Sequence, residues 1–207
     1  GMGEYGAGDV FAGLTVPQCR KIARDFRDLK MNEIKLLLTS AIHEERLIAL
    51  LLLVSKYQKA TGPDKNTIAQ FYLQSLAYAN DWDLVDSSAQ YILGDWLLKR
   101  NRKILYKLAR SKDLWKRRVA IISTFAFINA GEFEDTFAIA SMLMNDKHDL
   151  IHKATGWMLR EVGKRVSMDQ LRRFLQQHAA QMPRTALRYA IERMPEAERK
   201  NWLNAGK

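Results

Sequence analysis

Apolar residues recur at helical spacing along almost the whole chain after Pro17. Apolar positions three and four residues apart predict amphipathic helices, while strand-like alternation and hairpin turn dipeptides are missing from the sequence. We therefore expect an all-α protein. The predicted helices cover about 17–29, 31–40, 43–60, 63–78, 82–100, 102–110, 113–130, 132–145, 148–165, 168–180, 183–194 and 196–204.

The predicted helices form pairs, and the second helix of each pair begins in a similar way, with charged or polar residues followed by an apolar run. These starts are about 35 residues apart and fall near Glu44, Trp82, Trp115, Leu150 and Pro183. Helix pairs at this period are typical of HEAT-like solenoids. We expect one right-handed α-α superhelix over residues 17–207, after a tag scar and polar lead-in over residues 1–16. The second helices would line its concave surface.

The charge of the chain indicates the kind of partner. It carries 33 Lys and Arg against 23 Asp and Glu, which gives a formal net charge of +10. A basic surface attracts polyanions, and nucleic acid is the simplest of them, because each neutralised phosphate releases counterions. A merely soluble basic protein has the same composition, so only the clustering of the cations separates the two interpretations.

Several classes of protein do not fit the sequence. The longest apolar run, Leu47 to Val54, is too short to span a bilayer, so no membrane association is expected. A single cysteine, Cys19, fits a reducing cytoplasm and no disulfide scaffold. No Gly-rich phosphate loop or nucleophile elbow occurs, and no cofactor is expected. Nothing in the sequence suggests an obligate oligomer, so we expect a monomer.

Metal binding is not expected either. The histidines lack the spacing that would bring a second ligand to the same ion. The four histidines are His43, His148, His152 and His178.

Candidate chemistry lies at three neighbouring helix starts. Trp82 and Asp86 are four residues apart and share one helical face. In a repeat array, Arg118 and Trp157 would project from the next two second helices and meet this pair in one groove. Arginines hold phosphates with two hydrogen bonds, and a carboxylate stabilises a cationic transition state or positions a water molecule.

Further cations near these starts and the next one, at Pro183, are candidates for binding the DNA backbone: Lys116, Arg117, Lys153, Arg160, Arg184 and Arg188. Each candidate alone has a plainer interpretation. Asp86 could pair with a lysine, and Trp115 could be a packing residue. The arginines could form a solvated face. Only the joint spacing favours a functional groove.

At these residues the sequence resembles the AlkD-type DNA alkylation repair glycosylases, which are built from HEAT-like repeats. The resemblance lies in three blocks, Trp82–Asp86, Leu114–Ile121 and Lys153–Glu161, which occur in the family in this order and at near-identical spacing. The segment Pro183–Ala190 also fits the last repeat of the family. In all, the likeness runs from about Tyr5 to Met194.

The resemblance implies an activity and a set of roles. The family removes N3- and N7-alkylated purines from duplex DNA by cleaving the N-glycosidic bond, and it works without a pocket for an extruded base. By resemblance, Asp86 is the catalytic carboxylate, Trp82 and Trp157 contact the deoxyribose at the lesion, and Arg118 holds the nearby phosphate. The expected partner is double-stranded DNA that contains alkylated bases.

One departure from the family favours a second hypothesis. Family members usually begin with a further helix or helix pair before the segment that resembles Tyr5 to Phe11, so this chain is expected to start late. Since solenoids often act as scaffolds, the alternative is a non-catalytic HEAT-like module that binds DNA or a protein.

Overall fold

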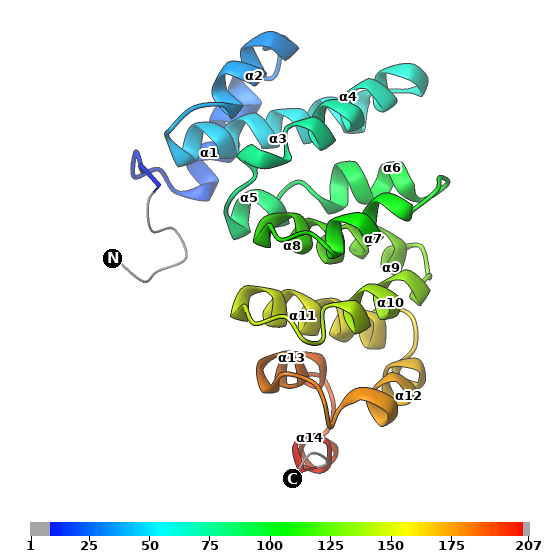
Figure 1. Cartoon of the computed structure of the whole chain (residues 1–207). Helices are drawn as coiled ribbons and strands as arrows, with labels where there is room; N and C mark the ends of the chain where they lie inside the picture. Colours follow the sequence, from blue (N-terminus) through cyan, green and yellow to red (C-terminus); the bar gives the residue numbers. More distant parts are fainter. Residues whose placement is uncertain (1–8, 205–207) are drawn as a thin grey trace. The chain divides into compact units, whose positions relative to one another are not determined.

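The computed structural model describes residues 9–204 of the chain, and the regular elements in that range are helices. The one exception is a single bridge between Val10 and Ile42. The predicted all-helical fold is therefore confirmed (Figure 1). The chain divides into two compact units, the first ending at Trp96 and the second beginning at Leu97. The single repeat domain expected over residues 17–207 stays a prediction.

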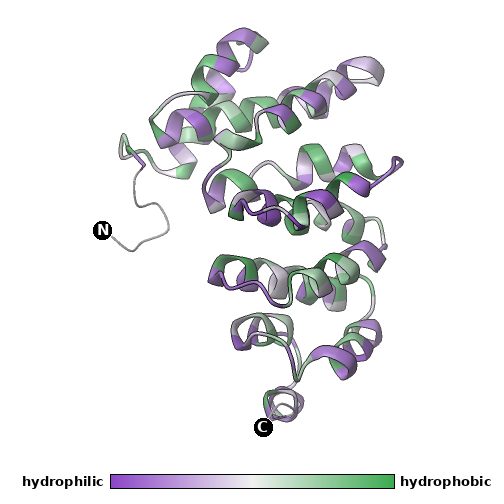
Figure 2. Ribbon diagram, in the orientation of Figure 1, coloured by the Kyte–Doolittle hydropathy of each residue, from purple (hydrophilic) through white to green (hydrophobic). Residues whose placement is uncertain are grey.

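The first unit is arranged around one long helix, α3, against which α1, α2, α4 and α5 pack. The apolar run inside α3 explains this position, because Leu47, Leu50 and Leu53 are all buried. Figure 2 shows apolar and polar residues interleaved along the helices. The elements are α1 (Val16–Asp25), α2 (Met31–Leu38), α3 (His43–Lys59), α4 (Gly62–Gln74), η1 (Leu76–Tyr78), α5 (Trp82–Asp86) and η2 (Gln90–Gly94), followed by α6 (Asp95–Leu97).

The predicted helix over 82–100 is broken in the structure. Helix α5 ends at Asp86, and a π-helical turn, η2, follows over Gln90–Gly94. In that turn the Gly94 N–H donates to the Ala89 carbonyl at 2.9 Å, five residues back. The apolar spacing could not reveal this change, since one extra residue in a single turn hardly alters it. Such π turns are frequent at functional sites.

The second unit is arranged around α11, which packs against α8, α12 and α13. The predicted helix over 113–130 is also divided, at Thr124, whose hydroxyl donates to the Ile121 carbonyl at 2.7 Å. The elements are α7 (Lys103–Ala109), α8 (Leu114–Ser123), α9 (Phe125–Asn129), α10 (Glu134–Met142), α11 (Asp149–Arg165), α12 (Met168–His178), α13 (Arg184–Ala190) and α14 (Glu196–Asn204).

A glycine allows α11 and α13 to approach closely. A Cβ atom at Gly156 would overlap the Ala186 carbonyl oxygen and lie 2.5 Å from the Tyr189 Cβ. Real Cβ atoms do not come that close, so only glycine fits at this crossing. The position of α13 against the helix that carries Trp157 depends on this residue.

Within residues 9–204, no helix has both the length and the apolar character needed to cross a bilayer.

Candidate functional site

The residues Trp82 and Asp86 occupy the single short helix α5. Helix α5 begins after Asp81, whose carboxylate accepts a hydrogen bond at 2.6 Å from the Trp82 N–H, one of the backbone donors left free at a helix start. Trp82 is 47% exposed, which is unusual for so large an apolar ring. Asp86 is half-buried at the other end of the same helix. An exposed aromatic ring and a carboxylate thus lie about one helical turn apart, as the sequence predicts.

The turn that follows Asp86 is anchored in the core. The Ser88 hydroxyl donates to the Leu84 carbonyl at 2.6 Å and lies 2.9 Å from the Tyr72 hydroxyl. Burial raises the pKa of Tyr72 well above its ordinary value, and the charge of Asp86 adds to the effect. Tyr72 is therefore a neutral hydrogen-bonding group at any physiological pH. Through Ser88, it anchors the end of α5 to the buried core.

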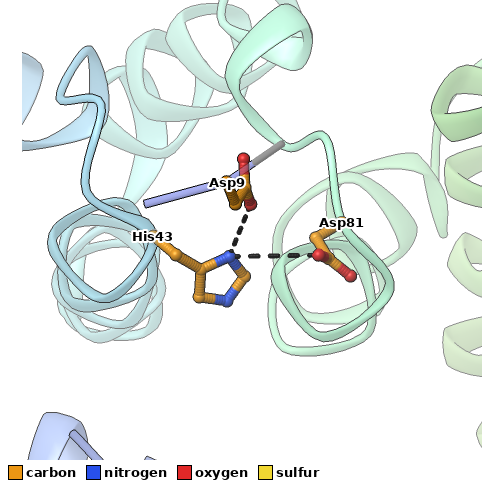
Figure 3. Close-up of side chains that lie close together, drawn as sticks. All are labelled: Asp9, His43 and Asp81. Carbon is orange, nitrogen blue, oxygen red and sulfur yellow. Dashed lines mark hydrogen bonds and ion pairs between the residues drawn. The ribbon is translucent and has the colours of Figure 1, made fainter. Parts of the chain in front are cut away.

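The start of α5 is held by a buried histidine that begins α3. The Nδ1 atom of His43 lies 2.9 Å from Asp9 Oδ2, and its Nε2 atom lies 2.9 Å from Asp83 Oδ2. Asp81 Oδ2 is 4.0 Å from Nδ1, and Figure 3 shows how His43 faces Asp9 and Asp81. Arg46 binds the same Asp9 oxygen at 2.7 Å.

These contacts make His43 a cation at neutral pH. Burial alone would lower the pKa of the imidazole, but the hydrogen bonds to Asp83 and Asp9 outweigh burial and raise the pKa to about 9. Both ring nitrogens therefore carry protons and donate to carboxylates. No pattern in the sequence reveals this cluster, because its three carboxylates are 34 to 40 residues from His43 along the chain.

The same cluster has the composition of a metal site, with one ligand atom each from Asp9, His43 and Asp81 within 4.8 Å of one another. A doubly protonated imidazole offers no lone pair to a metal ion, and the Arg46 guanidinium already binds Asp9. The cluster fits an ion-pair network better than a cation-binding site.

A second acidic residue of α3 binds the segment before α1. The Glu44 carboxylate accepts hydrogen bonds from the backbone N–H groups of Ala12 and Gly13, both at 2.8 Å, and of Leu14 at 3.1 Å. Although burial opposes the charge, these hydrogen bonds lower the pKa of Glu44. The expected polar lead-in is therefore held to the start of α3 by hydrogen bonds along the segment from Asp9 to Leu14, while the side chains of Val10 and Phe11 stay exposed. Residues 1–8 of that lead-in lie outside the described residues.

In the second unit, Arg118 is buried rather than presented on the surface. The Asp113 side chain caps α8 by accepting from the Trp115 N–H at 2.9 Å. One turn later, Arg118 is 5% exposed, and its Nη1 atom donates to the Leu150 carbonyl at 2.6 Å. The guanidinium therefore joins the start of α8 to the start of α11.

Trp157 lies farther along α11 and is half-buried, and the centroid of its ring lies 6.0 Å from that of the Phe125 ring. Arg118 and Trp157 are thus connected through α11 within the second unit. Trp82 and Asp86 belong to the first unit. The meeting of all four side chains in one groove stays a prediction.

Most of the cations proposed for DNA binding have a partner within the protein. Arg117 Nε binds Asp146 at 2.5 Å, and Arg160 binds Glu161 at 3.3 Å and also Glu192. These arginines contribute less free positive charge than the sequence suggests.

The lysines are engaged in a looser way. Lys153 lies 2.7 Å from Asp149, and Lys116 lies 3.8 Å from Asp113. Arg184 donates to the Leu203 carbonyl at 2.7 Å, whereas Arg188 lines an open cleft beside Glu192. Exposed pairs of this kind contribute little free energy, so a phosphate can replace the carboxylate at small cost.

The fold and these residues define a class of protein. It is a strongly basic helical-repeat protein that carries an exposed tryptophan and a carboxylate on one helical turn. The family described as DNA alkylation repair enzyme matches residues 1–194. The chain belongs to this family, as the resemblance in the sequence predicts.

Comparison with solved structures supports the same fold. A predicted DNA alkylation repair enzyme from Enterococcus faecalis superposes with a TM-score of 0.70 at 17% sequence identity. The match covers 91% of this chain and 90% of that one. At this identity the likeness shows the fold alone. No curated protein sequence matches the chain significantly.

Proposed function

We propose that this protein is a DNA glycosylase that removes cationic N3- or N7-alkylpurines from duplex DNA. The observation that carries the proposal is the match to the DNA alkylation repair enzyme family over residues 1–194, which includes every proposed catalytic residue. The exposed Trp82 and the carboxylate of Asp86 on one short helix support it. We further propose that it acts as a monomer in the cytoplasm.

The proposed reaction is hydrolysis of the N-glycosidic bond. The bond between C1′ and the purine nitrogen breaks, and both electrons leave with the base, which loses its positive charge and needs no protonation. The deoxyribose becomes an oxocarbenium-like cation. A water molecule then adds to C1′ and gives up a proton. An ionised Asp86 would stabilise the cationic sugar and orient that water molecule.

The other residues would hold the substrate. Trp82 offers an exposed aromatic face, which attracts the positively polarised sugar. Trp157 would contact the same deoxyribose. Arg118 would hold a neighbouring phosphate, which requires its guanidinium to bind the phosphate in addition to, or in place of, the Leu150 carbonyl.

The test is release of 7-methylguanine or a 3-methylpurine from alkylated duplex DNA under single-turnover conditions. Asp86→Asn keeps the size of the side chain and removes its charge, so the rate should fall by roughly 100- to 1,000-fold. The matched control is Asp64→Asn, which removes an exposed carboxylate of α4 and should leave the rate within about twofold of wild type.

Two outcomes would contradict the proposal. Folded wild-type protein that binds duplex DNA but releases no base would favour the alternative, a non-catalytic HEAT-like binding module. An Asp86→Asn variant as active as Asp64→Asn would remove Asp86 from the mechanism.

A further inference from the structure

The first unit contains a basic cleft between α1 and α3, with a volume of about 320 Å³. It is lined by Arg20, Ala23, Arg24, Arg27, Leu51, Ser55 and Lys59. The uncharged lining residues are buried or half-buried, and every charged lining residue is an exposed cation. The two helices that form it, α1 and α3, pack against each other. The sequence-based list of DNA-binding residues includes none of these cations.

Three of the cations lie on one face of α1 and the turn after it. Arg20, Arg24 and Arg27 follow one another at spacings of four and three residues, and all three are exposed. Like charges at this spacing repel each other. No ion pair joins any of the three to a carboxylate between residues 9 and 204. In the absence of a ligand, the three guanidiniums therefore repel one another weakly.

Helix ends account for only part of the cluster. Arg24 and Lys59 lie in the last turns of α1 and α3, where a cation is favourable beside the free carbonyl groups. Arg20 lies in the middle of α1, and Arg27 lies beyond its end, so neither has this explanation. These two residues distinguish the cleft from ordinary capping.

Other clefts of the described structure differ in charge. The cleft lined by Arg188, Arg199 and Lys200 also contains Glu192 and Glu196, and Glu196 binds Lys200 at 2.8 Å. The cleft beside α2 is lined mostly by apolar side chains, and its only charged lining residues are acidic: Glu33, Glu44 and Glu45. Only the α1–α3 cleft, among these three, presents cations without carboxylates.

We propose that the α1–α3 cleft binds phosphodiester groups of a DNA backbone. The arginine guanidiniums suit phosphate oxygens through paired hydrogen bonds, while Ser55 adds a hydroxyl donor and Lys59 a mobile charge. From Arg20 to Arg27 the cations extend about 10 Å along α1. One DNA strand places about three phosphates in that length, at about 3.4 Å each along the axis. A row of phosphates therefore fits better than a single small anion.

The cleft shares α3 with the candidate catalytic helix. The first residue of α3, His43, binds Asp83 of α5, and Ser55 of the cleft lies twelve positions later, about 18 Å along the helix. A strand of about five nucleotides spans that distance. The inference rests on the proposed function only in taking DNA as the source of the phosphates.

The experiment measures binding of an undamaged duplex by fluorescence anisotropy between 50 and 200 mM NaCl. The cleft variant is Arg20→Gln/Arg24→Gln/Arg27→Gln. The control is Lys21→Gln/Lys35→Gln/Lys107→Gln, which removes the same charge from exposed positions outside the cleft. At the lowest salt, the cleft variant should bind at least tenfold more weakly than the control. The slope of log K against log salt should shrink by about 2 to 3 in the cleft variant.

Two further arms sharpen the result. Arg20→Lys/Arg24→Lys/Arg27→Lys keeps the charge and should keep most of the salt slope. Inorganic pyrophosphate, titrated while the arginine side-chain NMR signals are followed, should bind more weakly than the duplex. Pyrophosphate that binds as tightly as the duplex would overturn the assignment to DNA.

Equal affinities and slopes for the cleft variant and the control would overturn the inference, as would a wild-type protein that binds no duplex. Neither measurement needs base release. A protein that binds DNA through the cleft yet removes no base would contradict the proposed function and leave the inference standing. A protein that removes alkylated bases, but whose cleft variant binds DNA as well as the control does, would contradict the inference and leave the proposed function standing.

Discussion

A buried cation, His43, organises the ionisable residues of the first unit. It is 4% exposed and donates to Asp9 on one side and Asp83 on the other. Buried charges cost free energy unless they are paired and hydrogen-bonded, and here both ring N–H groups are satisfied. The imidazolium therefore ties the segment before α1 to the helix that carries Trp82.

The first prediction at this scale concerns stability against pH. The pKa of His43 is raised to about 9 from an ordinary value near 6.5. Its contribution to the free energy of unfolding is therefore complete below about pH 6.5 and is lost as pH rises through 9. Denaturant unfolding at pH 6 and pH 10 should show His43→Gln to be less stable than wild type by up to about 3 kcal/mol at pH 6, with a smaller difference at pH 10.

The control is His178→Gln, since the His178 ring lies against that of Phe174 and no ion pair joins it to a carboxylate within residues 9–204. Its difference from wild type should stay constant between pH 7 and pH 10. Parallel stability curves for His43→Gln and wild type across that range would show that His43 is not a buried cation.

At the scale of elements, short helices and special turns carry the candidate residues. Helix α5 is five residues long and has little stability of its own. It is fixed by the Asp81 cap, by the ion pair between Asp83 and His43, and by Ser88 beneath its end. These tertiary supports allow a helix this short to present Trp82 and Asp86 in a defined geometry.

The second prediction belongs to the crossing of α11 and α13. Gly156→Ala would force a methyl group onto the backbone of Ala186 and the Cβ of Tyr189. Overpacking against backbone should lower the free energy of unfolding by about 2 to 4 kcal/mol, although alanine favours helix by about 1 kcal/mol. The measurement is denaturant unfolding followed by circular dichroism.

The matched control lies on the same helix. At Gly163 an added Cβ would meet mainly the Cδ2 atom of Leu171, the far end of a flexible side chain, at 2.6 Å. Gly163→Ala should therefore cost less than about 1.5 kcal/mol. Equal losses at both glycines would mean that the close helix crossing does not decide the cost.

At the scale of the whole molecule, charge is the dominant property. The formal net charge is +10. Several cations predicted to bind DNA are paired with carboxylates, as Arg117 is with Asp146. The α1–α3 cleft, in contrast, holds cations that form no ion pair with a carboxylate among residues 9–204. Positive charge is therefore distributed unevenly over the described surface.

The third prediction follows from that charge. Binding of wild-type protein to duplex DNA should weaken by at least tenfold between 50 and 200 mM NaCl, because phosphate contacts release counterions. Titration of a labelled duplex at four salt concentrations measures the slope directly. Affinity independent of salt would exclude backbone phosphates as the main contacts.

The amino-acid sequence by itself determined the helical class and much of the local structure. Apolar spacing and capping residues such as Asp81 and Asp113 act within a few positions, so the chain shows them directly. The spacing of Trp82 and Asp86 on one turn is local in the same way. The sequence also carried the resemblance to the family, which the match over residues 1–194 confirms.

Only the tertiary structure decided which charged groups are neutralised and which face solvent. His43 meets carboxylates 34 and 40 residues away, and Arg118 meets a carbonyl 32 residues away. Arg20 and Lys59 come to one cleft from two different helices. Such pairings depend on how helices cross, and the period of apolar positions leaves the crossing of helices undetermined. For this reason the sequence located the candidate carboxylate, while the network that holds its helix emerged only from the fold.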